Sequence, residues 1–228
     1  MAFDPTSGRL ILFGGGAANS DPPRKDTWSW DGSNWREEHP ATAPPVLDHA
    51  MMASDRTNRN LVLFGFGGPD LQVPMTWIWN GSNWIQKHPS RSPLQRNNAG
   101  LAAGAKSGVL LFGGQPGEAG SLNDSWAWDG DNWSQLHPAT NPPGGAVVMA
   151  REDGRQDVVM LEMDGTWRWN SSNWTKLTTS AQPPFEHFRA ITYDAARDRV
   201  VVFGGKAEPN QATNDTWLWD GSSWSKSS

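Results

Sequence analysis

The chain has 228 residues, including 24 glycines, 17 prolines and 15 tryptophans but no cysteine, and its formal net charge is -5. This small charge, with no run of basic residues, argues against a nucleic-acid partner. The lack of cysteine excludes disulfides, thiolate metal ligands and a cysteine nucleophile.

No segment approaches the ~18 consecutive apolar residues of a membrane-spanning helix, and the first ten residues do not have the pattern of a signal peptide. We therefore expect no contact with a membrane. The compartment stays open, and a secreted or cell-surface origin in bacteria is one alternative.

The first predicted strand comes at residues 10–15, where the apolar run LILFG ends in glycines that favour a sharp turn. The segment TWSWDGSNW follows at 27–35, and the proline-rich link PATAPP leads onward. Residues 50–55, the polar turn DRTNRN and the apolar run at 61–68 then predict a β-hairpin. Short strands joined by tight turns, rather than helices, are therefore expected.

These elements recur along the chain, and all fifteen tryptophans belong to five copies of one pattern, T/S-W-x-W-[DN]-[GS]-x-[NS]-W. The copies lie at Trp28/Trp30/Trp35, Trp77/Trp79/Trp84, Trp126/Trp128/Trp133, Trp167/Trp169/Trp174 and Trp217/Trp219/Trp224. A repeat of this length is typical of propellers and solenoids.

Each copy supplies four strands in the order of a propeller blade: inner strand a, glycine-ended strand b, Trp-x-Trp strand c and outer strand d. We predict one domain over residues 1–228, with blades at about 1–40, 41–89, 90–138, 139–179 and 180–228. The tryptophans are expected to form the cores between blades. Trp28 and Trp30 are expected to face opposite sides of their blade.

The repeat resembles the kelch repeat of β-propellers, in a tryptophan-rich form of bacterial type. Kelch blades carry a double glycine after strand b, an aromatic residue in strand c and a tryptophan at the start of strand d. Gly14-Gly15, Trp30 and Trp35 match these positions in the first copy, and VVMLEMDGTW departs from them in the fourth. The resemblance implies an all-β fold of five blades, like the central domain of galactose oxidase. The copper site of that enzyme needs tyrosine ligands, and this chain has only Tyr193.

We expect the five blades to close into a ring within a monomer. A closed monomer of five blades would pack blade five on blade one, through Trp217, Trp219, Trp28 and Trp30. The alternative is an excerpt of a propeller of six or seven blades, natural or engineered, that either closes by forming an oligomer or stays open.

Kelch resemblance implies that the b–c loops and the d–a links form the binding surface, and these are the segments that vary between repeats. The candidate binding residues in them are Arg24, Lys25, Asp70, Arg96, Glu118, Glu186, His187 and Lys206. The fourth repeat lacks its b–c loop, which predicts either a neutral deletion or a notch flanked by Glu118 and Lys206.

The first functional prediction is a non-enzymatic module that binds a protein or peptide, without a catalytic residue, cofactor or metal. The second is a carbohydrate-binding propeller. A third is an enzyme acting through Asp48, His49, Glu186 and His187, and a fourth is a propeller fragment with no function of its own.

Overall fold

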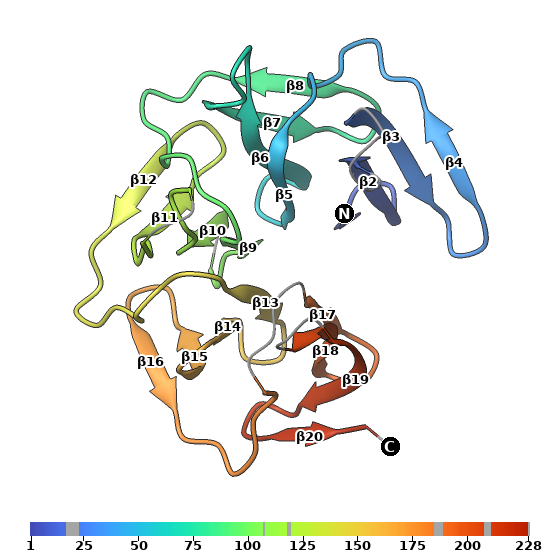
Figure 1. Ribbon diagram of the computed structural model, residues 1–228. Helices are drawn as coiled ribbons and strands as arrows, with labels where there is room; N and C mark the ends of the chain where they lie inside the picture. Colours follow the sequence, from blue (N-terminus) through green and yellow to red (C-terminus); the bar gives the residue numbers. More distant parts are fainter. Residues whose placement is uncertain (17–22, 107, 118–119, 185–188, 208–210, 228) are drawn as a thin grey trace. The chain divides into compact units, whose positions relative to one another are not determined.

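The computed structural model describes residues 1–16, 23–106, 108–117, 120–184, 189–207 and 211–227. In these residues every regular element is a β-strand, and the strands form five antiparallel sheets of four (Figure 1). The chain is thus an all-β, five-bladed β-propeller, as predicted. No helix among the described residues has the length and apolar character needed to cross a membrane.

The strand bounds follow the repeat. Blade one has β1 Ala2–Asp4, β2 Arg9–Gly15, β3 Arg24–Trp30 and β4 Trp35–Glu38, and blade two has β5 Asp48–Asp55, β6 Asn60–Gly67, β7 Val73–Trp79 and β8 Trp84–Lys87. Blade three has β9 Gly100–Ala103, β10 Val109–Phe112, β11 Ser125–Trp128 and β12 Trp133–Leu136. Blade four has β13 Val148–Glu152, β14 Asp157–Glu162, β15 Gly165–Trp169 and β16 Trp174–Leu177, and blade five has β17 Ala190–Asp194, β18 Arg199–Ala207, β19 Gln211–Trp219 and β20 Trp224–Lys226.

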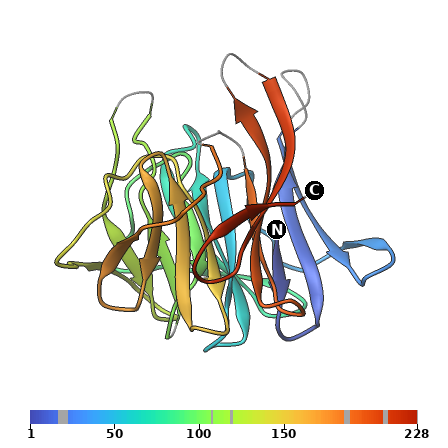
Figure 2. The same cartoon turned by 90° about the horizontal axis from the view of Figure 1, so that it is seen from below.

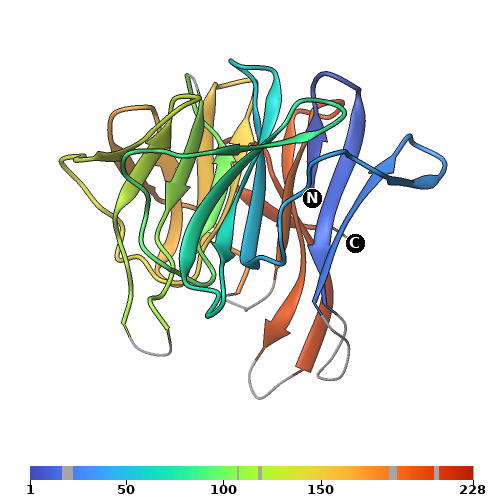
Figure 3. The ribbon, with the colours of Figure 1, turned by 90° about the horizontal axis from the view of Figure 1, so that it is seen from above.

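The chain divides into two compact units. The first comprises Met1–Gln95, Ser107–Val109 and Ala127–Ser134, and the second comprises Arg96–Lys106, Leu110–Trp126 and Gln135–Ser228. Blades one and two belong to the first unit and blades four and five to the second, while the residues of blade three are shared out between them. In the first unit, the strands of blade two run side by side in the order β5-β6-β7-β8 (Figure 3).

The turns between strands c and d form because their first residue caps the turn. Asp31 Oδ1 accepts the backbone N–H groups of Ser33 and Asn34, both at 2.8 Å. These hydrogen bonds lower the pKa of Asp31. Gly32 follows with φ 102°, which a residue with a Cβ rarely adopts. The motif [DN]-[GS]-x-[NS] therefore marks the hairpin in every blade.

The three tryptophans of a repeat lie on one face of their blade. Leu61, Leu63, Trp77, Trp79 and Trp84 of blade two share a core cluster with Ile11 and Phe13 of blade one. We call the face that packs on the preceding blade the rear face, and the opposite face the front face. The prediction that Trp28 and Trp30 face opposite ways is wrong, because side chains alternate with a period of two and residues i and i+2 share a face.

One contact recurs at four blade junctions. The indole N–H of the third tryptophan donates to a hydroxyl on the front face of the preceding blade: Trp84 to Thr27 at 2.9 Å, Trp133 to Thr76 at 3.0 Å, Trp174 to Ser125 at 3.0 Å and Trp224 to Thr166 at 2.9 Å. These four indoles are at most 2% exposed. The expected role of these tryptophans as cores between blades is thus observed at each of these junctions.

Trp217 and Trp219, the residues of blade five that were expected to pack on blade one, pack on blade four instead. Trp219 is fully buried and Trp217 packs beside it, in a cluster with Ala150, Val159 and Leu161 of blade four. Both therefore lie on the rear face of blade five. Trp28 and Trp30 are half-buried on the rear face of blade one.

Candidate functional site

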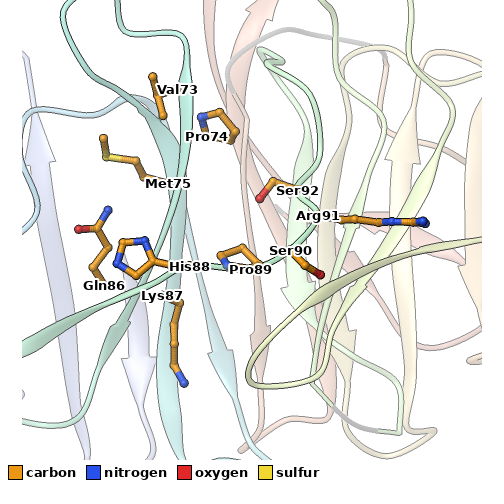
Figure 4. Close-up of a pocket in the computed structure, with 10 residues that line it drawn as sticks. All are labelled: Val73, Pro74, Met75, Gln86, Lys87, His88, Pro89, Ser90, Arg91 and Ser92. Atoms are coloured by element: carbon orange, nitrogen blue, oxygen red, sulfur yellow. The ribbon is translucent and has the colours of Figure 1, made fainter.

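Blade two, in the first unit, has a groove of about 430 Å³ at the end where strand c begins and strand d finishes, which we call its loop end (Figure 4). Val73, Pro74 and Met75 at the start of β7 line one part of it. Gln86 and Lys87 of β8 line another, and the link from His88 to Ser92 completes it. The groove therefore lies at the start of strand c, just after the b–c loop, and along the d–a link, and within the described part of the chain none of the eight predicted binding residues lines it.

The groove combines apolar and basic groups. The side chain of Val73 is 51% exposed and that of Met75 is half-buried, so apolar surface faces solvent in the groove. Arg91 and His88 are exposed, and Lys87 is held by Asp131 Oδ1 at 2.6 Å. A surface of this kind can bind one partner in two ways, because its apolar part contacts an apolar side chain and its cation donates hydrogen bonds to a carboxylate.

The backbone beside the groove is fixed by its own contacts. Leu71 has φ 52°, and a bulky side chain rarely adopts this left-handed conformation. Its N–H donates to the carbonyl of Gly68 at 3.2 Å, and its carbonyl accepts the side-chain amide of Gln95 from the link, also at 3.2 Å. The strained loop and the link are thus tied into one surface, and strain of this kind often accompanies function.

The predicted binding residues have different environments. Asp70 is exposed in the turn before β7, and Arg24 and Lys25 are exposed at the start of β3. Glu118, Glu186 and His187 lie outside the described residues, as does the side chain of Lys206. The predicted notch is therefore described only at its base, the short turn of blade four, and not at its two expected flanks, Glu118 and Lys206.

Arg96 has a different setting from the other predicted residues. It is fully buried, and it donates to both carboxylate oxygens of Asp124 at 2.7 and 3.0 Å and to the carbonyl of Gly113 at 2.9 Å. Burial opposes ionisation of Asp124, but hydrogen bonds from Arg96 and Trp126 outweigh it and lower the pKa of that carboxyl. The Arg96 guanidinium thus joins the d–a link to Asp124, the residue directly before β11.

In blade four the b–c loop is absent, as the sequence indicates. Only Met163 and Asp164 separate β14 from β15, whereas β18 and β19 of blade five extend in a much longer hairpin (Figure 2). Met163 at this short turn is 74% exposed.

Sequence reasoning missed a carboxylate pair at this turn. Glu162 is 3% exposed, and its Oε2 accepts the N–H of Gly144 at 3.2 Å. Burial, then the neighbouring Asp164, raises the pKa of Glu162 to about 8. Asp164 binds Lys176 and the indole of Trp167, both at 2.8 Å, and with the hydrogen bond from Glu162 these overcome burial and lower its pKa. The signal in the sequence was the replacement of the double glycine by Glu162-Met163.

The predicted channel cluster is described in part. His49 Nε2 lies 3.2 Å from Asp48 Oδ2 at the start of β5, with both side chains partly exposed. Within the described ranges, no group of three or more His, Asp or Glu side chains is placed to hold a metal ion.

Comparison with known proteins shows the fold and leaves the family open. No protein-family model matches the chain, and no curated protein matches its sequence. The chain is similar to a solved structure described as "Structure of YjhT", with a TM-score of 0.64 at 13% sequence identity. The similarity covers 97% of this chain and 81% of that one. At this identity the likeness supports a β-propeller fold alone.

Proposed function

We propose that this chain is a non-enzymatic binding domain built of kelch-type repeats, and that it binds a protein segment in the groove at the loop end of blade two. The observation that carries the proposal is the groove itself, which the exposed Val73 and the partly buried Met75 line on one side and the cationic Arg91 lines at the other edge, its side chain pointing away from them (Figure 4). Exposed apolar surface with a polar rim is typical of a site for a protein partner.

The chemistry of the groove favours an extended segment that has an apolar residue and, separated from it along the segment, an acidic residue (Figure 4). The apolar side chain would contact Val73 and Met75, and the carboxylate would accept two hydrogen bonds from the Arg91 guanidinium. A glycan is less well matched, because sugar rings stack on aromatic faces and the ten lining residues include no Trp, Tyr or Phe.

The experiment uses immobilised ten-residue peptides that combine apolar residues with Asp or Glu, and the same peptides with Asn or Gln in their place. We expect the full chain to bind the acidic peptides and to lose at least about tenfold in affinity when the carboxylates are replaced, because bonds between charged groups are the stronger ones. Arg91→Glu and Val73→Ser should cause a similar loss.

Matched controls are available on other strands. Arg36 is exposed on β4, and Ile85 on β8 is 46% exposed, close to the value for Val73. Arg36→Glu and Ile85→Ser should leave peptide binding unchanged. Binding that ignores Arg91→Glu and Val73→Ser would refute the proposal, and so would binding to a glycan array without binding to any peptide.

A further inference from the structure

A second pocket lies between blades one and two, at the end of the blades opposite the loop end. It has a volume of about 290 Å³, and all the residues that line it belong to the first unit. Arg9 of β2, Ser29 of β3 and Arg36 of β4 line it on the front face of blade one. Trp79 at the end of β7 and Gly81 in the next turn line it from blade two.

The two arginines of the pocket keep most of their hydrogen-bond donors available. Arg9 Nη1 lies 3.9 Å from Glu38 Oε1, and Arg36 Nη2 lies 3.8 Å from Glu38 Oε2, whereas charge-assisted hydrogen bonds measure about 2.7–2.9 Å. Arg9 Nη1 also lies 3.4 Å from Ser29 Oγ, which is a long hydrogen bond. Since a guanidinium has several N–H donors, both cations can bind a further acceptor.

The carboxylate of Glu38 is held in place between the two cations. Its Oε1 accepts the hydroxyl of Ser29, which is 2% exposed, at 2.7 Å. With the two arginines, the lining residues therefore carry two positive charges and one negative charge, a net charge of +1. The apolar lining residues Ile11 and Trp79 are at most 2% exposed. Such apolar surroundings strengthen the attraction of the pocket for an anion.

The fold itself does not require polar residues at these positions. Ile78 and Ile85 of blade two lie opposite each other on neighbouring strands, as Ser29 and Arg36 do in blade one. Ile78 is 4% exposed, so an apolar side chain at this position packs well within the same unit. The polar set of blade one is therefore better explained by a ligand than by the packing of the blades.

Two guanidiniums and one carboxylate together discriminate between oxyanions. Phosphate and sulfate both offer charged oxygens to Arg9 and Arg36. Phosphate also keeps a P–OH group near neutral pH, and this group can donate a hydrogen bond to Glu38. Sulfate and a carboxylate ligand are fully ionised at this pH, so their oxygens would face the Glu38 carboxylate without a proton between them, which is unfavourable.

We propose that this pocket binds a small ligand through a phosphate group that carries a proton. Arg9 and Arg36 donate hydrogen bonds to its charged oxygens, and Glu38 accepts a hydrogen bond from its P–OH group. The volume of about 290 Å³ admits a free phosphate or a small phosphomonoester. The pocket shares no lining residue with the groove of blade two, so it binds phosphate whether or not that groove binds a peptide.

Isothermal titration calorimetry of the full chain with inorganic phosphate at neutral pH tests the proposal, with sulfate at equal ionic strength as the comparison. We expect one phosphate to bind per chain, and sulfate to bind at least about tenfold more weakly. Arg9→Gln and Arg36→Gln should each weaken phosphate binding at least about tenfold, because each removes a charged donor. Glu38→Gln should bring the two affinities together, since its amide can donate to either anion.

Arg197 supplies the matched control. Its side chain is 76% exposed, close to the 71% of Arg36, and it also lies beside a carboxylate, with Nη1 2.8 Å from Asp194 Oδ2. Arg197→Gln should leave phosphate binding unchanged. Far-UV circular dichroism checks that all the variants keep the fold.

Glycerol 3-phosphate distinguishes the two sources of the phosphate group. At a pH of about 5.5 both it and inorganic phosphate carry a P–OH group, because the second pKa of a phosphomonoester is about 6. Tighter binding of glycerol 3-phosphate at this pH would indicate a phosphomonoester as the ligand, and tighter binding of inorganic phosphate would indicate the free anion.

Three results would overturn the proposal. The first is a chain that does not bind inorganic phosphate, and the second is phosphate binding that Arg9→Gln and Arg36→Gln leave unchanged. The third is sulfate that binds the original chain as tightly as phosphate does.

Discussion

The hydroxyl of Thr27 should contribute measurably to the stability of the first blade junction. It accepts the indole N–H of Trp84 at 2.9 Å, and both residues are at most 1% exposed. Thr27→Val keeps the shape of the side chain but leaves a buried donor unpaired, which costs about 1–3 kcal/mol. In a chain of this length each kcal/mol corresponds to a decrease of about 2–4 °C in Tm.

Thr216→Val is the matched control, because Thr216 occupies the same position in blade five but is half-buried. We expect its free energy of unfolding to stay within about 0.5 kcal/mol of the original value, as for most surface substitutions. Urea unfolding followed by tryptophan fluorescence measures the free energy of unfolding of both variants. Equal stability of Thr27→Val and Thr216→Val would refute the role we give to the hydroxyl.

Three further substitutions test other parts of the chain. Folding raises the pKa of Glu162 from 4.5 to about 8, so the contribution of this group to stability is complete below pH 4.5 and is lost as the pH rises to 8. The urea midpoint of the original chain should therefore fall between pH 4.5 and pH 8, and Glu162→Gln should make the midpoint less dependent on pH over that range. Arg96→Ala should lower the free energy of unfolding by about 3–5 kcal/mol, because it leaves Asp124 without its buried partner; a loss below about 1 kcal/mol would contradict this. Leu71→Asn should raise the Tm by a few degrees, since asparagine tolerates a positive φ; an unchanged or lower Tm would count against strain at Leu71.

Much of the fold could be predicted because the repeat marks each strand and turn with residues that have one physical role. Asp31 and Gly32 together specify a tight turn, and the b-strand run ending in glycine specifies a buried strand. The same-face placement of Trp28 and Trp30 could also have been predicted from the two-residue period of a strand. That error also misassigned the ring-closing role of Trp217 and Trp219, which pack on blade four.

The candidate site was harder to predict, because the sequence does not show which loop residues are satisfied within the fold. Arg96 and Arg91 lie in the same link and look alike in the sequence. Only the fold shows that Arg96 reaches Asp124 some 28 residues away and that Arg91 stays exposed. The pairing of Glu162 with the N–H of Gly144 depends in the same way on contacts between distant segments.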